Sequence, residues 1–506
     1  MQRVTRIMAI AAIVFSGITF GSPNLAASAA VFRPNVAEWQ FMTASTTPPT
    51  EAQCYSAGRR CFMPASMAAS YNYASLLSGG NQGQGKTIAV VDSFGSDTIQ
   101  HDLHVFDQAF GLQAMCGEEG VTCTSGMPTF SVFSLQGSPS TNGQPPNNGT
   151  GQEDRSAWAL EVSLDVEWAH STAPKANILL VTTPTAETLG VQGIPQMMNA
   201  IQYVVDNHMA DVISMSFGTG EGAFHNGSAA LMNNRQGFID AQANHVTLFA
   251  SSGDGGTTNN MKEPVKNPKP IPYPSVGWPA SDPLVTAVGG TYLCTDANTG
   301  TSVDSTNPPG RCNNPALNNG GARETAWIAS GGGYSILFPR PSFQNTLPPG
   351  SSYVGSSAGA PGPNSNMRGV PDIAYQASAT TGGLVYITLP PDGTSGLLCS
   401  GGPCSTGWYD VGGTSASSPQ WAGLIAIADQ MAGHDLGFIN GALYQIANNP
   451  AQYAADFYDV TDPAASNCNQ LSSIPGYCAS PGWDAVTGLG TPNAVTLLPD
   501  LIAALP

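Results

Sequence analysis

Apolar residues along the chain gather into short continuous runs, separated by longer segments with helical spacing. The runs are rich in Val, Ile and Leu and occupy residues 86–94, 176–184, 210–218, 244–254 and 283–293. Runs without alternating polar residues favour strands that are buried on both faces. Helical spacing appears between them at residues 153–171, 190–208 and 229–244. This alternation predicts an α/β fold with a doubly wound parallel sheet and helices on both faces.

The polar segments of the chain set its expected organisation. Long Gly-, Pro- and Asn-rich segments lie at about 113–155, 256–275, 295–325 and 345–366, and each is too polar to form a core of its own. None is followed by a new periodicity, so we expect one large domain over residues 66–506. Residues 30–65 are polar, carry Pro and Thr and lack clear periodicity. They are predicted to form a short N-terminal extension.

The first 29 residues have the pattern of a secretory signal peptide. Arg3 and Arg6 precede an uncharged, mostly apolar stretch at residues 7–20, and small residues follow at Ala27–Ala29. The apolar stretch is too short for a transmembrane helix. We therefore expect a secreted, extracellular protein without a membrane anchor, although a buried N-terminal helix is the alternative interpretation.

The charge composition of the chain limits the kinds of molecule that it is expected to bind. The chain has 506 residues, 16 Lys and Arg against 34 Asp and Glu, and a formal net charge of −18. That balance argues against nucleic-acid and anionic-membrane partners, because both need a basic face. Only 10% of the residues are charged, so protonating the acids at low pH would leave little positive self-repulsion. This favours an acidic medium, although halophilic or merely secreted proteins can look similar.

Ten cysteines fall into five local pairs, as expected of disulfides in an exported protein. No CxxC motif occurs and no cysteine has a nearby histidine, which disfavours zinc. Nearest-neighbour pairing is the simplest connectivity, but other pairings stay open. The expected pairs are Cys54–Cys61, Cys116–Cys123, Cys294–Cys312, Cys399–Cys404 and Cys468–Cys478.

The sharpest motif is GGTSASSPQWAGLIAIADQ at residues 412–430. A Gly-Gly-Thr-Ser turn precedes an apolar helix, and Pro419 lies in the first turn, where a missing N–H costs little. Ser415 is therefore presented at a helix N-terminus, where its own N–H and the helix dipole can stabilise an oxyanion. A plain helix cap is the structural alternative for this serine.

A nucleophilic serine needs a proton acceptor. In subtilisins this base is a histidine, usually within the sequence His-Gly-Thr, and no histidine of this chain stands in that sequence. The helical segment 153–171 offers Glu161 and Asp165, which are four residues apart and share one face. Two carboxyls this close raise at least one pKa and titrate together, so the pair can act as base and then as acid in an acidic medium. Asp154 and Glu167 are rival carboxylates, but neither forms such a pair.

With these two motifs, the chain resembles the sedolisins, serine-carboxyl peptidases that keep the subtilisin fold but replace the histidine base by a Glu-xxx-Asp pair. The resemblance runs from about residue 65 to the C-terminus. It includes residues 88–96, 216–218, 250–256, 281–291, 330–344, 368–374 and 437–447. It implies a subtilisin-like α/β fold in which Ser415 is the nucleophile, Glu161 the base and Asp165 its partner.

The resemblance also assigns roles outside this triad. Asp254 takes the oxyanion-hole position, and a carboxyl can donate a hydrogen bond there only while it is protonated. Residues Ser216, Phe217 and Gly218 are expected to offer a backbone edge to an extended substrate. Asp92, at the end of the run 88–92, is either part of the surrounding polar network or a plain strand-end turn.

A C-terminal loop is expected to bind one structural Ca²⁺, because two carboxylates with loop carbonyls form a hard-oxygen set. By resemblance, the side-chain ligands are Asp459 and Asp484, and Val460, Ser480 and Gly482 contribute backbone oxygens. Only about 35 residues separate the expected cleavage site from the first family-like segment, although sedolisins commonly carry a long folded propeptide.

Together these features predict a secreted, acid-acting serine-carboxyl endopeptidase. It would act as a monomer on protein or peptide substrates. A tripeptidyl exopeptidase on the same fold and, with less support, an inactive extracellular binding protein are the alternatives.

Overall fold

The protein is described here by a computed structural model. It describes residues 33–34, 38–135, 155–184, 193–223, 228–258, 273–304, 312, 322–351, 366–389, 398–399, 402–403, 405–461, 468–471 and 474–505. The predicted signal peptide, Asp154 and Cys404 lie outside these residues.

A central sheet of eight strands follows the order β11-β10-β8-β6-β3-β5-β4, with β14 also paired to β10. All of its pairs are parallel except β10 with β11, so the predicted parallel sheet carries one antiparallel strand. The five predicted runs all form strands. The bounds are β3 (Thr87–Ser93), β4 (Phe130–Phe133), β5 (Asn177–Thr183), β6 (Val212–Met215), β8 (Thr247–Ser251), β10 (Thr286–Leu293), β11 (Glu324–Ala326) and β14 (Ile373–Gln376).

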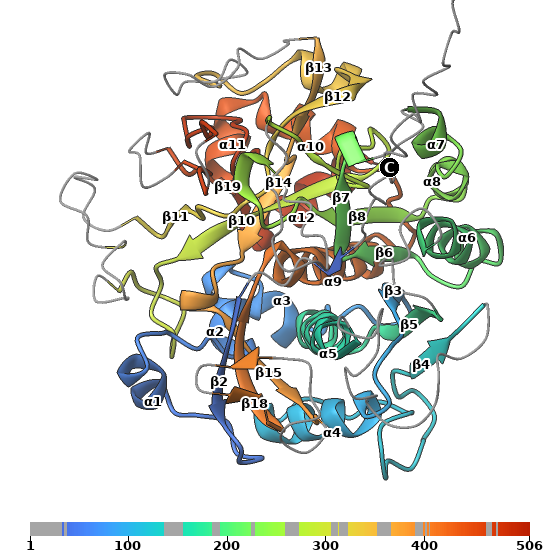
Figure 1. The fold of residues 1–506 in the computed structure, drawn as a ribbon, viewed down its shortest axis with the longest axis vertical. Helices are drawn as coiled ribbons and strands as arrows, with labels where there is room; N and C mark the ends of the chain where they lie inside the picture. The colour runs from blue at the N-terminus through green and yellow to red at the C-terminus, as the bar shows by residue number, and fades with distance from the viewer. Residues whose placement is uncertain are drawn as a thin grey trace, which may run out of the picture.

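Helices cover both faces of this sheet, as the α/β alternation predicted. Ile88 and Val90 of β3 belong to the core that also contains α5 and α9, whereas Ala89 and Val91 face the core containing α6 and α8. Figure 1 shows α5 and α9 near the centre of the molecule and α6 to α8 together at its right-hand side. The larger helices are α4 (Ile99–Phe110), α5 (Arg155–Thr172), α6 (Gly193–Asp206), α8 (Gln236–Ala243), α9 (Thr414–Ala432), α10 (Asn440–Ala447) and α12 (Ala494–Ala504), and the shorter ones are α1 (Glu51–Ser56), α2 (Pro64–Ser70), α3 (Ala74–Ser78), α7 (Ser228–Met232) and α11 (Pro450–Asp456).

The prediction of one continuous helix over residues 229–244 was wrong, because the helix is interrupted in the middle of this segment. The segment forms α7 and α8, separated by residues 233–235. Two consecutive asparagines, which favour helices poorly, stand at this break. Arg235 follows them and binds the buried carboxylate of Asp282 through two nitrogens, so a tertiary ion pair fixes the start of α8.

A second sheet, which the sequence pattern did not predict, leads directly to the predicted nucleophile. It has the order β15 (Gly383–Ile387), β18 (Gly407–Gly412), β2 (Glu38–Thr43), and both pairings are antiparallel. Strand β2 comes from the predicted N-terminal extension, and β18 runs into α9. The boundary at residue 65 stays a prediction, but residues 38–43 are hydrogen-bonded to β18, the strand that precedes Ser415.

Smaller pairings complete the described fold. They involve β1 (Arg33–Pro34), β7 (Phe217–Gly220) and β9 (Gly277–Trp278) in one sheet, and the pairs β12 (Gly333–Pro339) with β13 (Met367–Val370), β16 (Leu398–Cys399) with β17 (Gly402–Pro403), and β19 (Phe457–Tyr458) with β20 (Thr491–Pro492).

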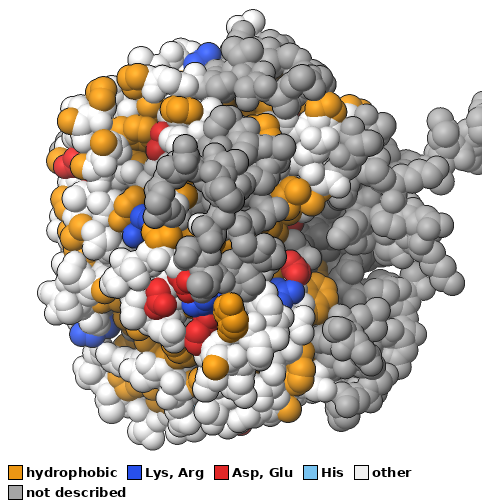
Figure 2. Space-filling model, turned by 90° about the vertical axis from the view of Figure 1, so that its left-hand side faces the viewer, with side chains coloured by type: hydrophobic (Ala, Val, Ile, Leu, Met, Phe, Trp, Pro, Cys, Tyr) orange, Lys and Arg blue, Asp and Glu red, His pale blue; other side chains and the backbone are white. Residues whose placement is uncertain are grey.

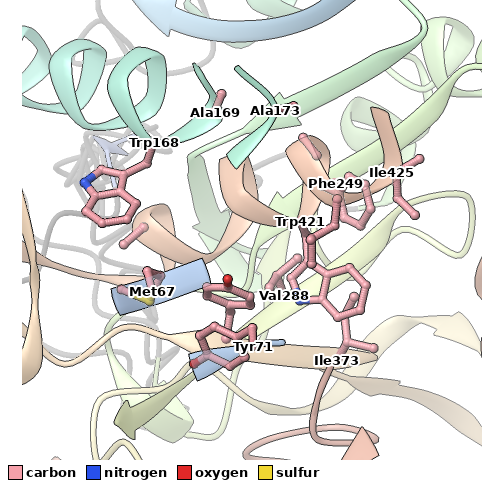
Figure 3. Packing of buried hydrophobic residues seen from close by; sticks show 14 of the residues in the cluster. Met67, Tyr71, Trp168, Ala169, Ala173, Phe249, Val288, Ile373, Trp421 and Ile425 are labelled. Atoms are coloured by element: carbon pink, nitrogen blue, oxygen red, sulfur yellow. The ribbon is translucent and has the colours of Figure 1, made fainter. Parts of the chain in front are cut away.

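Helix α5 packs closely against α9, so the acidic pair expected on α5 lies near the serine expected on α9. Figure 3 shows Trp168 on α5 and Trp421 on α9 within one apolar cluster, where the Trp421 ring lies 6.2 Å from that of Phe249 on β8. A Cβ added at Gly423 would lie only 2.6 Å from Cβ of Thr172, so the two helices approach where one has no side chain. Any larger residue at Gly423 would push the helices apart.

Four of the five expected disulfides are formed, at Cys54–Cys61, Cys116–Cys123, Cys294–Cys312 and Cys468–Cys478. The fifth includes Cys404 and stays a prediction. On the face shown in Figure 2, charged side chains are few and most of the described surface is uncharged. Among the described helices, none combines the length and apolar character needed to cross a bilayer.

Candidate active site

The serine expected as nucleophile stands at the start of a buried helix. Strand β18 ends at Gly412, and Ser415 is the second residue of α9. Gly413 between them has φ +137°, a conformation that favours glycine. A Cβ at Gly412 would lie 2.2 Å from the backbone N of Ala379, so this turn has no room for a side chain. The Ser415 side chain is buried, and its Oγ lies 3.4 Å from the carbonyl oxygen of Ser216.

The acidic pair predicted on α5 is fully buried and faces this serine. Neither oxygen of Glu161 has a hydrogen bond of ordinary length to a described residue, but the Ser415 hydroxyl lies close enough to lower the pKa of the carboxyl. Burial, followed by the charges of Asp165 and Asp92, outweighs that effect and raises the pKa of Glu161 well above its usual value. Burial and the charge of Asp92 do the same for the pKa of Asp165. The pair therefore holds its protons tightly. Of the rivals, Glu167 instead accepts the N–H of Tyr386 on β15.

A third carboxyl, Asp92 at the end of β3, completes this acidic cluster. Burial raises its pKa to about 8, and neither of its oxygens has a hydrogen-bond partner among the described residues. The charge of Asp92 in turn raises the pKa values of Glu161 and Asp165. The sequence left two roles open for Asp92, and its burial near Glu161 and Asp165 favours a place in the polar network over a plain strand-end turn. This role stays a prediction.

Asp254 lies in the loop after β8 and reaches the first residue of α9. Its Oδ1 accepts a hydrogen bond from the backbone N–H of Thr414 at 2.8 Å and another from the Thr414 hydroxyl at 2.9 Å. The neighbouring Gly253 accepts the N–H of Gly331 at 2.7 Å, and a Cβ at Gly331 would lie 2.2 Å from the carbonyl oxygen of Ser252. The glycine-rich segment 331–333 therefore packs against the loop that holds Asp254.

Ser216 connects α5 and α9, a role that was not predicted from the sequence. Its Oγ donates to Asp165 Oδ1 at 2.9 Å and lies 3.4 Å from the carbonyl oxygen of Ser415. The signal for this role is the polar interruption between the apolar run of β6 and the Phe-Gly pair that follows, which places a hydroxyl at the carboxyl end of a central strand.

The backbone edge expected to receive substrate is occupied by the chain itself. Strand β1 pairs antiparallel with β7, with Pro34 opposite Phe217 and Arg33 opposite Gly218, and β9 pairs with the other half of β7. Figure 1 shows the short blue arrow of β1 at the centre of the molecule, and β1 also lies against α5. The Phe217 ring is buried in the core, so only the backbone at this position is available for strand pairing. The edge therefore accepts an extended strand.

The residues predicted to bind calcium come together in one loop region. Asp459 Oδ2 accepts the N–H of Gly482 at 2.8 Å, and the buried Asp484 accepts the N–H of Ser480 at 3.1 Å. Burial raises the pKa of Asp459 to about 6 and that of Asp484 to about 7. Asp459 Oδ1 and the Ser480 hydroxyl are buried without a hydrogen bond of ordinary length, and Val460, the residue after Asp459, is also buried. These unsatisfied oxygens fit a cation.

The described residues hold no group of three or more His, Cys, Asp or Glu side chains arranged for a metal. A cation at this loop would therefore rest on the two carboxylates and on main-chain oxygens. Calcium binding and the ligand roles stay predictions.

The model of the subtilase family matches residues 146–441, more than half of the chain. The chain belongs to the subtilase family, in its sedolisin group. The matched range contains Glu161, Asp165, Asp254 and Ser415 and ends before the expected calcium loop. The family resemblance is thus confirmed, whereas the individual catalytic roles stay predictions.

This sedolisin is similar in sequence to kumamolisin and to tripeptidyl-peptidase 1. Kumamolisin from Bacillus sp. (strain MN-32) is 30% identical over 462 residues, which cover 89% of this chain and 66% of kumamolisin. Tripeptidyl-peptidase 1 from Rattus norvegicus is 28% identical over 363 residues, which cover 70% of this chain and 53% of that protein. The chain therefore spans less than two thirds of the length of each relative.

The fold has a solved counterpart. The structure of Pseudomonas sedolisin (serine-carboxyl proteinase), complexed with two molecules of pseudo-iodotyrostatin, superimposes with a TM-score of 0.60 at 24% identity. The match covers 87% of this chain and 98% of that structure. This similarity confirms the predicted subtilisin-like α/β fold.

Proposed function

We propose that this protein is a secreted, acid-acting serine-carboxyl endopeptidase that hydrolyses peptide bonds through an acyl-enzyme on Ser415. The observation that carries the proposal is the packing of a buried Glu161–Asp165 pair against a serine at a helix N-terminus, with no histidine in the described part of this cluster. A carboxyl pair in such a place is a base that works where imidazole is already protonated.

The reaction begins when Ser415 Oγ attacks the scissile carbonyl carbon while Glu161 takes the hydroxyl proton. Asp165, held by Ser216 Oγ, orients and polarises Glu161. Protonated Asp254 donates a hydrogen bond to the oxyanion, and the dipole of α9 adds to this stabilisation. Glu161 then gives its proton to the leaving amine. Water hydrolyses the acyl-enzyme by the same steps, again with Glu161 as base.

Activity at acidic pH follows from the protonation state that each carboxyl group needs for its role. Asp254 can donate to the oxyanion only while it is protonated, so rising pH ends activity by ionising it. Burial and mutual repulsion keep a proton on the Glu161–Asp165 pair, and activity falls in strong acid when the pair is fully protonated.

The substrate is a protein or peptide that adds an extended strand to β7 at Ser216, Phe217 and Gly218. The pairing of Arg33 and Pro34 with this edge supports the proposal, because it shows that the backbone there accepts an antiparallel strand. Substrate binding then requires that the chain's own residues 33–34 leave the edge.

We also propose one structural Ca²⁺ at the C-terminal loop. Asp459 and Asp484 would hold it with main-chain oxygens of Val460, Ser480 and Gly482, and the bound ion would offset the charge of a buried and a partly buried carboxylate. The ion lies outside the catalytic chemistry and stabilises the loop.

Export and monomeric action are part of the proposal. The pattern of residues 1–29 supports export, and the four formed disulfides suit an oxidising compartment. The acidic composition gives no support to nucleic-acid or membrane partners.

A tripeptidyl exopeptidase is the second candidate, because tripeptidyl-peptidase 1 is a relative at 28% identity. Long peptides blocked at both ends separate the two candidates. An endopeptidase cleaves them, whereas a tripeptidyl exopeptidase requires a free N-terminus.

The test of the peptidase proposal is hydrolysis of such peptides between pH 2 and pH 8 by the wild type and Ser415→Ala. We expect wild-type cleavage and a loss on the order of 10⁶-fold in the variant. Matching circular-dichroism spectra would show that the variant is folded. Full cleavage by Ser415→Ala would overturn the nucleophile assignment.

A further inference from the structure

Thr414, the residue before the nucleophile, is buried and makes a chain of hydrogen bonds around Asp254. Its Oγ1 accepts the N–H of Gly253 at 3.0 Å and donates to Asp254 Oδ1 at 2.9 Å. Its backbone N–H donates to the same Oδ1 at 2.8 Å. One residue therefore supplies two donors to a single oxygen of the carboxyl.

The direction of these bonds bears on the proton of Asp254. A threonine hydroxyl has a single proton. The N–H of Gly253 already donates to Oγ1, and the hydroxyl proton of Thr414 points to Oδ1. Two donors on Oδ1 make this oxygen an acceptor. A protonated Asp254 therefore carries its proton on Oδ2.

We propose that Thr414 is a positioning residue that holds Asp254 Oδ1 as an acceptor and so places the acid proton on Oδ2, from which it is donated to the oxyanion. This inference rests on the proposed peptidase function. Both donors of Thr414, the backbone N–H and the hydroxyl, are directed at Asp254 Oδ1. Thr414 acts through Asp254 and fixes both the orientation of the carboxyl and the oxygen that donates.

The loss of the hydroxyl has two opposite effects on measured activity. Without the hydroxyl, the backbone N–H of residue 414 is the remaining donor from this residue to Oδ1. The carboxyl is then less firmly oriented and donates less well to the oxyanion, so kcat falls. A hydrogen bond donated to a carboxyl also stabilises its ionised form, so removing it raises the pKa of Asp254. The loss of activity at rising pH then occurs at a higher pH. Glu161, Asp165 and Asp92 face the same cluster and titrate in every variant, so the comparison between variants isolates Asp254.

The test compares Thr414→Val, which removes the hydroxyl at nearly constant volume, with Thr414→Ser, which keeps it. We expect kcat of Thr414→Val to fall by about tenfold or more with a small change in KM, and its alkaline limb to move up by about one pH unit. Thr414→Ser should restore both values toward the wild type. Equal profiles for the two variants, or an unmoved alkaline limb, would overturn the proposal.

The variant Asp254→Asn provides a second, independent test, which can be carried out even if Thr414→Val does not fold. In this variant, the carbonyl oxygen can accept from Thr414 and the NH₂ group replaces the protonated Oδ2. We expect measurable cleavage without the alkaline limb, and an unchanged alkaline limb would contradict the proposal. Inactivity of the wild type on every peptide would instead refute the peptidase function itself, so the two failures are distinguishable.

Discussion

Two pairs of carboxyls in this molecule, one fully buried and one partly exposed at Asp459, have opposite surroundings. Among the described residues, Glu161 and Asp165 receive one hydrogen bond of ordinary length between them, from Ser216 Oγ. Asp459 and Asp484 receive five, four from backbone N–H groups and one from the Thr487 hydroxyl. The pKa values differ in the same way. They rise to about 6 for Asp459 and about 7 for Asp484, whereas those of Glu161 and Asp165 rise well above the usual range.

The difference shows how surroundings decide what an acidic pair can do. Donors directed at a carboxylate stabilise its charge and leave it suited to a cation, whereas burial with few donors makes it hold and return a proton. The α5 pair is therefore suited to proton transfer, and the loop pair to a structural ion. Each experiment below changes one side of this comparison.

The largest effect is expected from Glu161→Gln, which removes the proposed base while keeping the size of the side chain. Peptide cleavage should fall by about 10²–10⁴-fold, the usual contribution of a general base. Steady-state kinetics at the acidic optimum measures this change.

Glu167→Gln is the matched control, because it makes the same substitution at a buried position of the same helix. Its amide oxygen can still accept the N–H of Tyr386. The control should therefore keep most of the activity. Similar losses in the two variants would mean that burial of α5, and not proton transfer by Glu161, accounts for the effect.

The next effect concerns stability and pH at Asp92, whose pKa is raised to about 8 from a usual 3.8. Below pH about 4 the carboxyl is protonated in the folded and the unfolded chain. Between pH 4 and 8 the unfolded chain ionises first, so the free energy of unfolding falls by up to about 1.4 kcal/mol per pH unit for this group. Asp92→Asn should remove that contribution, as urea unfolding at several pH values would show.

Asp97→Asn is the control for this slope, because Asp97 is an exposed carboxylate five residues further along the chain. It should leave the pH dependence of unfolding as it is in the wild type. An unchanged slope in Asp92→Asn would show that Asp92 ionises normally in the folded protein.

The smallest effect is expected from removal of calcium. A site saturated at about 100 times its Kd stabilises the folded state by about 2.7 kcal/mol, so a chelator should lower the melting temperature of the wild type. Asp459→Asn should melt at the chelated value and respond little to chelator or to added Ca²⁺. Equal responses of the variant and the wild type would remove Asp459 from the site.

Local sequence pattern was sufficient for five of the eight strands of the central sheet, for α5 and for the start of α9. It missed β4, which lies within the polar segment 113–155, and it predicted no run at β11 or β14. The apolar runs and the i,i+4 acidic pair are features of neighbouring residues. Pairings between distant segments were not predicted, as with β2 against β18 or β1 against β7, because nothing in residues 33–43 alone indicates which strand they join. Ser216 was assigned only to the substrate edge, since its contact with Asp165 joins residues 51 positions apart and depends on the tertiary fold.

The pH dependence of kcat/KM for a long, end-blocked peptide between pH 2 and pH 9 is the most direct test of a serine activated by carboxyl groups. We expect a maximum in the acidic range, with activity lost as the pH rises through the ionisation of Asp254. A maximum above pH 8 would contradict the account, because a protonated Asp254 could not then be part of the active enzyme.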